Sequence, residues 1–126
     1  MNSKQIYDLE DRLITFACLC LEVCELLPNT KAGQNLEYQL SKSSTASALI
    51  YGEAQAAESG NDFLHKIKLV LKEIRETRIN LRIIKQKPLV QNQKIELALN
   101  EINQLMAIFL RSIETAKNNQ QIRKKG

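Results

Sequence analysis

Residues 51–77 read YGEAQAAESGNDFLHKIKLVLKEIRET, and the second half of this stretch decides the fold. From Phe63 onward, seven residues recur at alternating steps of four and three. They are Phe63, Ile67, Val70, Ile74, Thr77, Leu81 and Ile84. This a/d pattern is typical of a helix that packs against other helices. Most charged residues around it are basic, so the pattern predicts one helix with a buried stripe and a basic exterior.

The composition indicates an all-α protein. The chain has 126 residues with only four glycines and two prolines, whereas an all-β fold needs turn residues at short intervals. A chain of this length forms one domain and buries roughly two thirds of its unfolded surface. We expect a bundle over residues 1–118, followed by a basic, frayed tail over residues 119–126.

Three further segments show helical periodicity, which predicts four helices in all. Their expected limits are about Tyr7 to Leu27, about Lys31 to Glu58, and about Leu89 or Gln91 to Asn118, while the third helix follows the break at residues 59–62 and runs to about Gln86. Thr30 and Ser59 are expected N-caps, and Lys87-Pro88 should end the third helix. Short loops join these segments, which predicts an antiparallel, up-down-up-down four-helix bundle.

Small hydroxyl residues crowd the middle of the second helix. They are Ser41, Ser43, Ser44, Thr45 and Ser47. Such residues lower helix propensity, but they also let a neighbouring helix approach closely. We favour close packing over a hydroxyl-lined groove, because Leu36, Leu40, Ile50 and Ala54 keep an apolar stripe through this segment.

The cysteines indicate a reducing compartment. Cys18, Cys20 and Cys24 lie on one apolar helix, and an odd number without a partner cluster favours free thiols in a cytoplasm. Cys20 and Cys24 are one turn apart, but no histidine or further cysteine is near in the sequence to complete a metal site. We therefore expect buried thiols, no metal and no cofactor. No apolar run is long enough to span a membrane.

Candidate catalytic residues are few. The single histidine, His65, lies off the apolar stripe and lacks the acidic spacing of di-iron bundles, so we expect it at the surface. Glu73 and Glu76 read as an exposed pair. Glu53 stands among small residues and is expected to pair with a basic side chain of the third helix. Without a nucleophile–base arrangement or a glycine-rich phosphate loop, we expect no enzyme activity.

Charge is spread unevenly along the chain. Residues 1–28 hold two basic and five acidic side chains, whereas residues 59–87 hold eight basic and three acidic ones. The candidate nucleic-acid-binding residues are Lys68, Lys72, Arg75, Arg78, Arg82 and Lys85, with the Arg123–Lys125 tail assisting. Lys68, Lys72, Arg75 and Arg82 share one helix face, and the other two line an adjoining strip. Since no aromatic residues interleave with them, recognition should be of backbone or shape.

Several short motifs, in this order and spacing, resemble one known family. The motifs are Asp8-Leu9-Glu10-Asp11-Arg12-Leu13, Tyr51-Gly52-Glu53-Ala54, Glu58-Ser59, Asp62-Phe63, Lys66, Leu71-Lys72-Glu73, Glu76-Thr77, Ser112-Ile113 and Thr115-Ala116-Lys117. Over about residues 7–118 the chain resembles the 23S rRNA intervening-sequence (S23) proteins. It departs from them at Ala46 and Ile50, where many members have serine and asparagine.

The resemblance implies a left-handed bundle that assembles into a homopentameric ring in a bacterial cytoplasm. It also implies kinship with the accessory variability proteins of diversity-generating retroelements, which bind nucleic acid and a reverse transcriptase through a basic surface. Most members have no assigned activity.

Together these observations predict a non-enzymatic, oligomeric helical bundle that binds RNA or DNA backbone. The alternative is a structural or protein-interaction scaffold whose basic face meets an acidic partner. In the oligomer, the acidic first helix of one subunit would approach the basic third helix of the next. Leu64, Leu71 and Ile83, which lie off the apolar stripe, would be covered by that contact.

Overall fold

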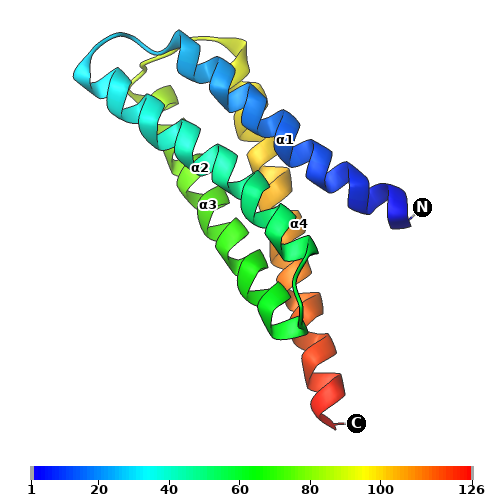
Figure 1. Ribbon diagram of the computed structural model, residues 1–126. Coiled ribbons are helices and arrows are strands. Elements are labelled where there is room, and N and C mark those ends of the chain that lie inside the picture. The colour runs from blue at the N-terminus through cyan, green and yellow to red at the C-terminus, as the bar shows by residue number, and fades with distance from the viewer. Residues whose placement is uncertain (1, 126) are drawn as a thin grey trace.

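The computed structural model describes residues 2–125, with side chains described for residues 9–123, and this part of the chain forms four α-helices and no strand (Figure 1). They are α1 (Asn2–Leu26), α2 (Lys31–Gln55), α3 (Gly60–Gln86) and α4 (Gln93–Lys125). Each helix packs against the next, and α1 also packs against α4, which closes the bundle. The predicted all-α bundle is confirmed. None of these helices is long and apolar enough to cross a membrane.

The apolar stripe of α3 forms the centre of the core, as predicted, except at its first position. From Ile67 to Ile84, the six stripe residues are each at most 1% exposed. Phe63, which we expected to be buried, is only half-buried. It lines a groove between the start of α3 and the C-terminal part of α4, at an open end of the bundle.

Two leucines of α3 that we expected to need cover from another subunit are buried within the monomer. Leu64 is 8% and Leu71 is 5% exposed. A helix in a bundle contacts neighbours on two sides, so its buried stripe is wider than the a/d positions alone. Ile83, in contrast, stays 47% exposed.

The hydroxyl-rich middle of α2 packs closely against α3, as predicted. Ser43, Ser44 and Ser47 are buried. The Thr77 hydroxyl of α3 donates a hydrogen bond to the Ser43 hydroxyl at 2.7 Å, and the Ser47 hydroxyl donates to the Ser44 carbonyl oxygen at 2.7 Å. Because these buried hydroxyls have partners, their burial costs little. Small side chains therefore let α2 and α3 pack closely, although Ser43 also borders a shallow groove between the two helices.

Both predicted N-caps are confirmed. Thr30 accepts a hydrogen bond from the Gly33 amide, and Ser59 accepts one from the Asp62 amide, each at 3.1 Å. These contacts satisfy amides at the helix starts that have no partner within the helix. The third helix ends at Gln86, directly before Lys87-Pro88, as expected.

Four helix limits differ from the prediction, and one of them is the start of α4, which lies at Gln93 and not at Leu89 or Gln91. α1 already begins at Asn2, and α2 ends at Gln55, ahead of Glu58. α4 continues to Lys125 instead of ending at Asn118 with a frayed tail. Residues 119–125 are rich in glutamine, arginine and lysine, which favour helix, and the Gln120 side chain donates a hydrogen bond to Asn61 of α3 at 2.7 Å.

Candidate nucleic-acid interface

The outward face of α3 carries most of the predicted cations. Because the core stripe occupies one side of the helix, Lys68, Lys72, Arg75 and Arg82 point outward on the opposite side, and all four are exposed. None of the four forms an ion pair within the described part of the chain. We call these four residues the outer basic row.

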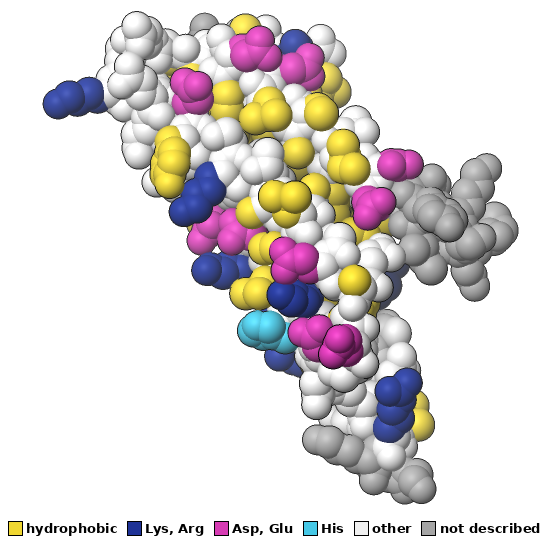
Figure 2. Space-filling view, in the orientation of Figure 1, with side chains coloured by type: hydrophobic (Ala, Val, Ile, Leu, Met, Phe, Trp, Pro, Cys, Tyr) yellow, Lys and Arg dark blue, Asp and Glu magenta, His cyan; other side chains and the backbone are white. Residues whose placement is uncertain are grey.

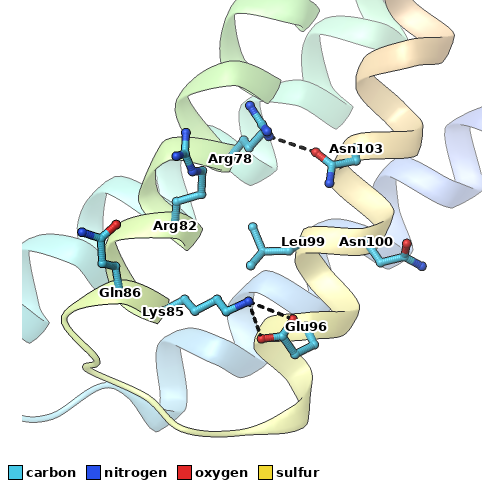
Figure 3. Close-up of a pocket in the computed structure, with 8 residues that line it drawn as sticks. All are labelled: Arg78, Arg82, Lys85, Gln86, Glu96, Leu99, Asn100 and Asn103. Carbon is cyan, nitrogen blue, oxygen red and sulfur yellow. Dashed lines mark hydrogen bonds and ion pairs between the residues drawn. The ribbon is translucent and has the colours of Figure 1, made fainter.

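The other two predicted cations, Arg78 and Lys85, bond to residues of α4, although Lys85 remains exposed. The Arg78 Nε atom donates a hydrogen bond to Asn103 Oδ1 at 2.9 Å, and Lys85 Nζ lies 2.9 Å from a carboxylate oxygen of Glu96 (Figure 3). These two bridges cross a shallow groove between α3 and α4. Leu99 of α4 points into the space between the bridges. The six predicted residues therefore divide into an outer row of four and a groove pair.

The groove between α3 and α4 has a volume of about 640 Å³. Four residues of each helix line it: Arg78, Arg82, Lys85 and Gln86 from α3, and Glu96, Leu99, Asn100 and Asn103 from α4. Arg82 belongs to both surfaces, since it lies in the outer basic row and at the edge of the groove. Three cations against one carboxylate give the groove a positive field.

Carboxylates limit the basic surface on the side toward α2. Glu73 and Glu76 line a second groove, between α2 and α3, together with Lys42, Lys72 and Ser43. Partial burial raises the pKa of Glu73, and the neighbouring Glu76 carboxylate raises it further, while Lys72 and Lys42 oppose the shift. The pair is therefore less exposed at Glu73 than we expected. On the side toward α4, in contrast, Arg78, Arg82 and Lys85 outnumber the single carboxylate of Glu96.

Two exposed isoleucines lie among the cations. Ile79 is 54% and Ile83 is 47% exposed, and both line a shallow depression with Arg82, Gln86 and Lys87. The heptad pattern marked Ile83 as lying off the stripe, but we did not assign it or Ile79 to the candidate site. The basic face therefore offers some apolar contact as well as charge.

The face formed by α1 and α2 has a different character. Apolar side chains are spread over it, with acidic side chains between and beside them (Figure 2). Ile14 and Leu21 of α1 are 49% and 39% exposed, and Tyr38 and Leu49 of α2 are 59% and 68% exposed. We call these four residues the apolar face. We did not predict this face from the sequence.

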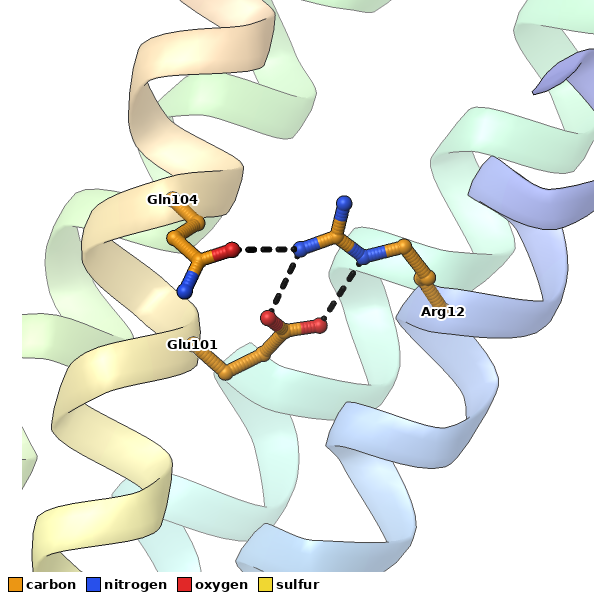
Figure 4. Close-up of polar contacts among 3 residues, drawn as sticks. All are labelled: Arg12, Glu101 and Gln104. Carbon is orange, nitrogen blue, oxygen red and sulfur yellow. Dashed lines mark hydrogen bonds and ion pairs between the residues drawn. The ribbon is translucent and has the colours of Figure 1, made fainter.

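An ion pair attaches α1 to α4. The Arg12 guanidinium donates to both carboxylate oxygens of Glu101, at 2.7 and 3.1 Å, and also to Gln104 at 3.3 Å (Figure 4). The hydrogen bond to Glu101 raises the pKa of Arg12, so its charge is fixed at any physiological pH. Because Arg12 is paired, the exposed carboxylates of Glu10, Asp11 and Glu25 leave the exterior of α1 acidic, while Glu22 pairs with Lys94 of α4 at 3.2 Å.

Glu53 pairs with a lysine of α3, as predicted. Its carboxylate lies 2.9 Å from Lys66 Nζ. Glu53 is exposed, so this is a surface pair that joins α2 to α3 and contributes little to stability. His65, one residue earlier on α3, is exposed, as expected.

Cys20 and Cys24 are buried, as predicted, whereas Cys18 is exposed. Burial raises the pKa of both buried thiols, that of Cys24 to about 11. The Cys24 thiol donates to the Glu37 carbonyl oxygen at 3.6 Å. Both thiols therefore stay protonated and pack as small apolar side chains. Among the described residues, no three histidine, cysteine, aspartate or glutamate side chains form a group that could hold a metal ion.

The basic end of α4 lies near the start of α3. Arg123 and Arg111 line the groove that contains Phe63, together with Ile108 and Ala116. Arg123 is exposed. Lys124 and Lys125, predicted to assist binding, lie outside the described side chains.

No protein-family model matches the chain, and no curated protein matches its sequence. Among solved structures, the chain is similar to a protein of unknown function from the S23 ribosomal protein family of Bacteroides thetaiotaomicron. The two share 23% identity and superpose with a TM-score of 0.76, over 83% of this chain and 97% of that chain. At this identity the likeness shows a shared fold, in agreement with the family resemblance of the sequence motifs. The chain thus has the four-helix fold of a solved member of the S23 ribosomal protein family.

Proposed function

We propose that the protein is a non-enzymatic, homo-oligomeric scaffold that binds the phosphate backbone of RNA or DNA through α3. The observation that carries this proposal is the outer basic row. From Lys68 to Arg82 it extends over about 21 Å of helix, with a cation at steps of about 4.5 to 6 Å, except for one gap of two turns that Arg78 partly fills. Such a row suits a polymer with a charge in every unit.

Binding at this surface is expected to be electrostatic and weak for one subunit. Each phosphate that a lysine or arginine neutralises releases counterions, so affinity should fall as salt rises. Without exposed aromatic side chains in the row, bases have no stacking platform. Several copies in one oligomer would bind one polymer more tightly, because the second contact becomes intramolecular.

The surfaces of the bundle also support a homo-oligomer. The apolar face with its acidic surround complements the groove around Phe63, whose apolar lining is flanked by Arg111 and Arg123. A head-to-tail contact between these two surfaces leaves the outer basic row free, and a head-to-tail contact repeated in a closed ring gives a cyclic oligomer. We propose the pentamer that the family resemblance implies.

A charge-reversal experiment tests the proposed binding. Replacing Lys72, Arg75 and Arg82 together by glutamate should abolish binding of a labelled oligonucleotide, while circular dichroism stays helical, because these side chains point outward. A control variant with glutamate at Lys31, Lys42 and Lys117 makes the same change in net charge at exposed positions off α3 and should retain most of the affinity. For the unchanged protein on duplex DNA, four phosphate contacts predict a log–log salt slope of about −3.6.

Two results would contradict the proposal. One is equal binding by the α3 variant and the unchanged protein. The other is the absence of any binding at low salt. Either result would favour a second function, a scaffold for proteins, which the exposed apolar face supports. An acidic partner, such as a reverse transcriptase, would then be the ligand of the basic row.

A further inference from the structure

We propose that Arg78 and Arg82 form a clamp for one phosphate of the bound strand at the edge of the α3–α4 groove, with Asn103 as the residue that positions Arg78. This inference rests on the proposed function. It states that the six cations contribute unequally to the affinity for the strand. A surface that binds by net charge alone would give each cation a similar weight. The geometry assigns the largest weight to the pair beside Asn103.

Arg78 is held in place before any ligand binds. Its Nε atom donates to Asn103 Oδ1 at 2.9 Å, and the residue is half-buried. A guanidinium has five N–H donors, so this contact uses one and leaves the four donors on the two Nη atoms for a ligand. The side chain has already lost part of its freedom, so less entropy is lost when a phosphate binds.

Arg82 completes the clamp from the next turn of α3. Four residues separate it from Arg78, which places the two about 6 Å apart along the helix axis. Arg82 is exposed and forms no ion pair within the described part of the chain, so its donors are also free. Two arginines that approach one phosphate provide the parallel, charge-assisted hydrogen bonds that this group accepts.

Lys85, one turn further along, is a weaker candidate despite its charge. Both carboxylate oxygens of Glu96 lie within reach of its Nζ atom, at 2.9 and 3.2 Å. This pairing offsets the lysine charge, and the carboxylate repels an approaching phosphate. The groove therefore has one end that favours an anion, at Arg78, and one end that does not, at Lys85 (Figure 3).

A nucleic-acid strand fits this clamp better than an acidic protein does. The outer basic row continues from Arg82 along α3 to Lys68, so a ligand held in the clamp meets further cations at regular steps. A phosphodiester backbone has a charge in every unit, whereas protein carboxylates seldom recur at such spacing. An acidic protein is the competing occupant.

Two matched pairs of variants test the clamp without any change of net charge. Arg78→Lys and Arg75→Lys make the same substitution on one helix, but only Arg78 has an orienting partner. Asn103→Leu and Asn100→Leu form the second pair, on α4. Both asparagines line the groove, but only Asn103 bonds to an arginine. The nucleic-acid probes are four fluorescein-labelled oligonucleotides, single-stranded and duplex, of DNA and of RNA. Labelled polyglutamate represents an acidic protein, and all titrations are made at low salt and followed by anisotropy.

The clamp predicts that Arg78→Lys weakens binding about tenfold, the equivalent of one lost charge-assisted hydrogen bond. Asn103→Leu should weaken it about threefold to tenfold, and the two control variants less than twofold. Thermal unfolding identifies any variant that has lost its fold. If Asn103→Leu does not fold, Asn103→Ala takes its place.

The outcomes separate the clamp from the proposed function. If the unchanged protein binds none of the four probes at low salt, the proposed function fails and the clamp fails with it. If the unchanged protein binds but all four variants bind equally well, or both lysine variants are weakened alike, the clamp is wrong and binding by net charge stands. If Arg78→Lys loses affinity for polyglutamate and keeps its affinity for oligonucleotides, the clamp belongs to an acidic protein and the inference is overturned.

Discussion

The outer face of α3 and the outer face of α1 and α2 lie on the same core but have opposite surface chemistry. On α3, the residues opposite the core stripe are mainly lysine and arginine, with Ile79 and Ile83 between them. On α1 and α2, the exposed apolar residues Ile14, Leu21, Tyr38 and Leu49 stand among acidic side chains, and Lys42 lies beside Tyr38. The fold determines which residues face outward, but it does not determine their chemistry. The two outward faces can therefore suit two kinds of partner, a nucleic acid at α3 and another subunit at α1 and α2.

The charge of each face depends on which of its charged residues are paired with an opposite charge. On α1, Arg12 is bound to Glu101, so the remaining exterior is acidic. On α3, only Lys66 and Lys85 have a carboxylate partner among the described residues, so the outer basic row keeps its charge. In the proposed oligomer, the acidic exterior of α1 faces the groove beside Phe63 of the next subunit, which Arg111 and Arg123 flank, and the outer basic row stays free.

The largest expected effect separates the two sides of α3. Ile74 is fully buried, so Ile74→Ala should lower the free energy of unfolding by about 2–5 kcal/mol. Ile79 is 54% exposed, so Ile79→Ala should change it by less than about 0.5 kcal/mol. Urea denaturation of both variants measures the difference. Similar values for the two would show that the core and outer sides of α3 have been assigned incorrectly.

The next effect tests whether the apolar face is a contact surface. Replacing Ile14 and Leu21 together by glutamate should dissociate the oligomer into monomers near 14.4 kDa, because two apolar contacts are lost and two charges would have to be buried in the contact. Leu97 and Leu110 of α4 are exposed to a similar degree and provide the control pair. Sedimentation equilibrium at micromolar concentration measures the masses. If the unchanged protein is already a monomer, the apolar face is not a contact surface between subunits.

The smallest effect concerns the acidic border of the basic face. The folded state raises the pKa of Glu73 above its ordinary value of 4.5, chiefly through burial, so it favours the protonated carboxyl group. This contribution to stability is present below the unfolded pKa and is lost as pH rises through the folded pKa. Glu73→Gln should therefore stabilise the protein at pH 7 by less than about 0.5 kcal/mol, since solvent screens the partly exposed group.

Urea denaturation of both proteins at pH 4 and pH 7 measures this effect. The stabilising effect of Glu73→Gln should shrink at the lower pH, where the unchanged protein is protonated as well. Glu114→Gln, at an exposed position on α4, is the control for loss of a negative charge. A variant that is less stable than the unchanged protein at pH 7 would show that Lys72 and Lys42 outweigh burial at Glu73.

The sequence predicted the features that depend on residues close together in the chain. The stripe from Ile67 to Ile84, the caps at Thr30 and Ser59 and the end of α3 before Pro88 all follow from local spacing. The contacts of Arg78 and Lys85 do not, because they depend on where Asn103 and Glu96 of α4 lie beside α3. Phe63 was misjudged for a related reason. Its heptad position is apolar, but the bundle is open beside it.

The hydrogen bond between Ser43 and Thr77 has a consequence for the alignment of α2 and α3. An apolar seam of similar residues tolerates sliding by one helical turn, about 5.4 Å, since one leucine can replace another. A buried pair of hydroxyls tolerates it less well, because sliding separates Ser43 from Thr77 and Asn80 and leaves Thr77 only the Glu73 carbonyl oxygen of its own helix. A buried hydroxyl left without a partner costs about 1–3 kcal/mol. The Ser43–Thr77 pair therefore favours one register of the two helices. That register determines which residues of α2 stand beside the cations of α3.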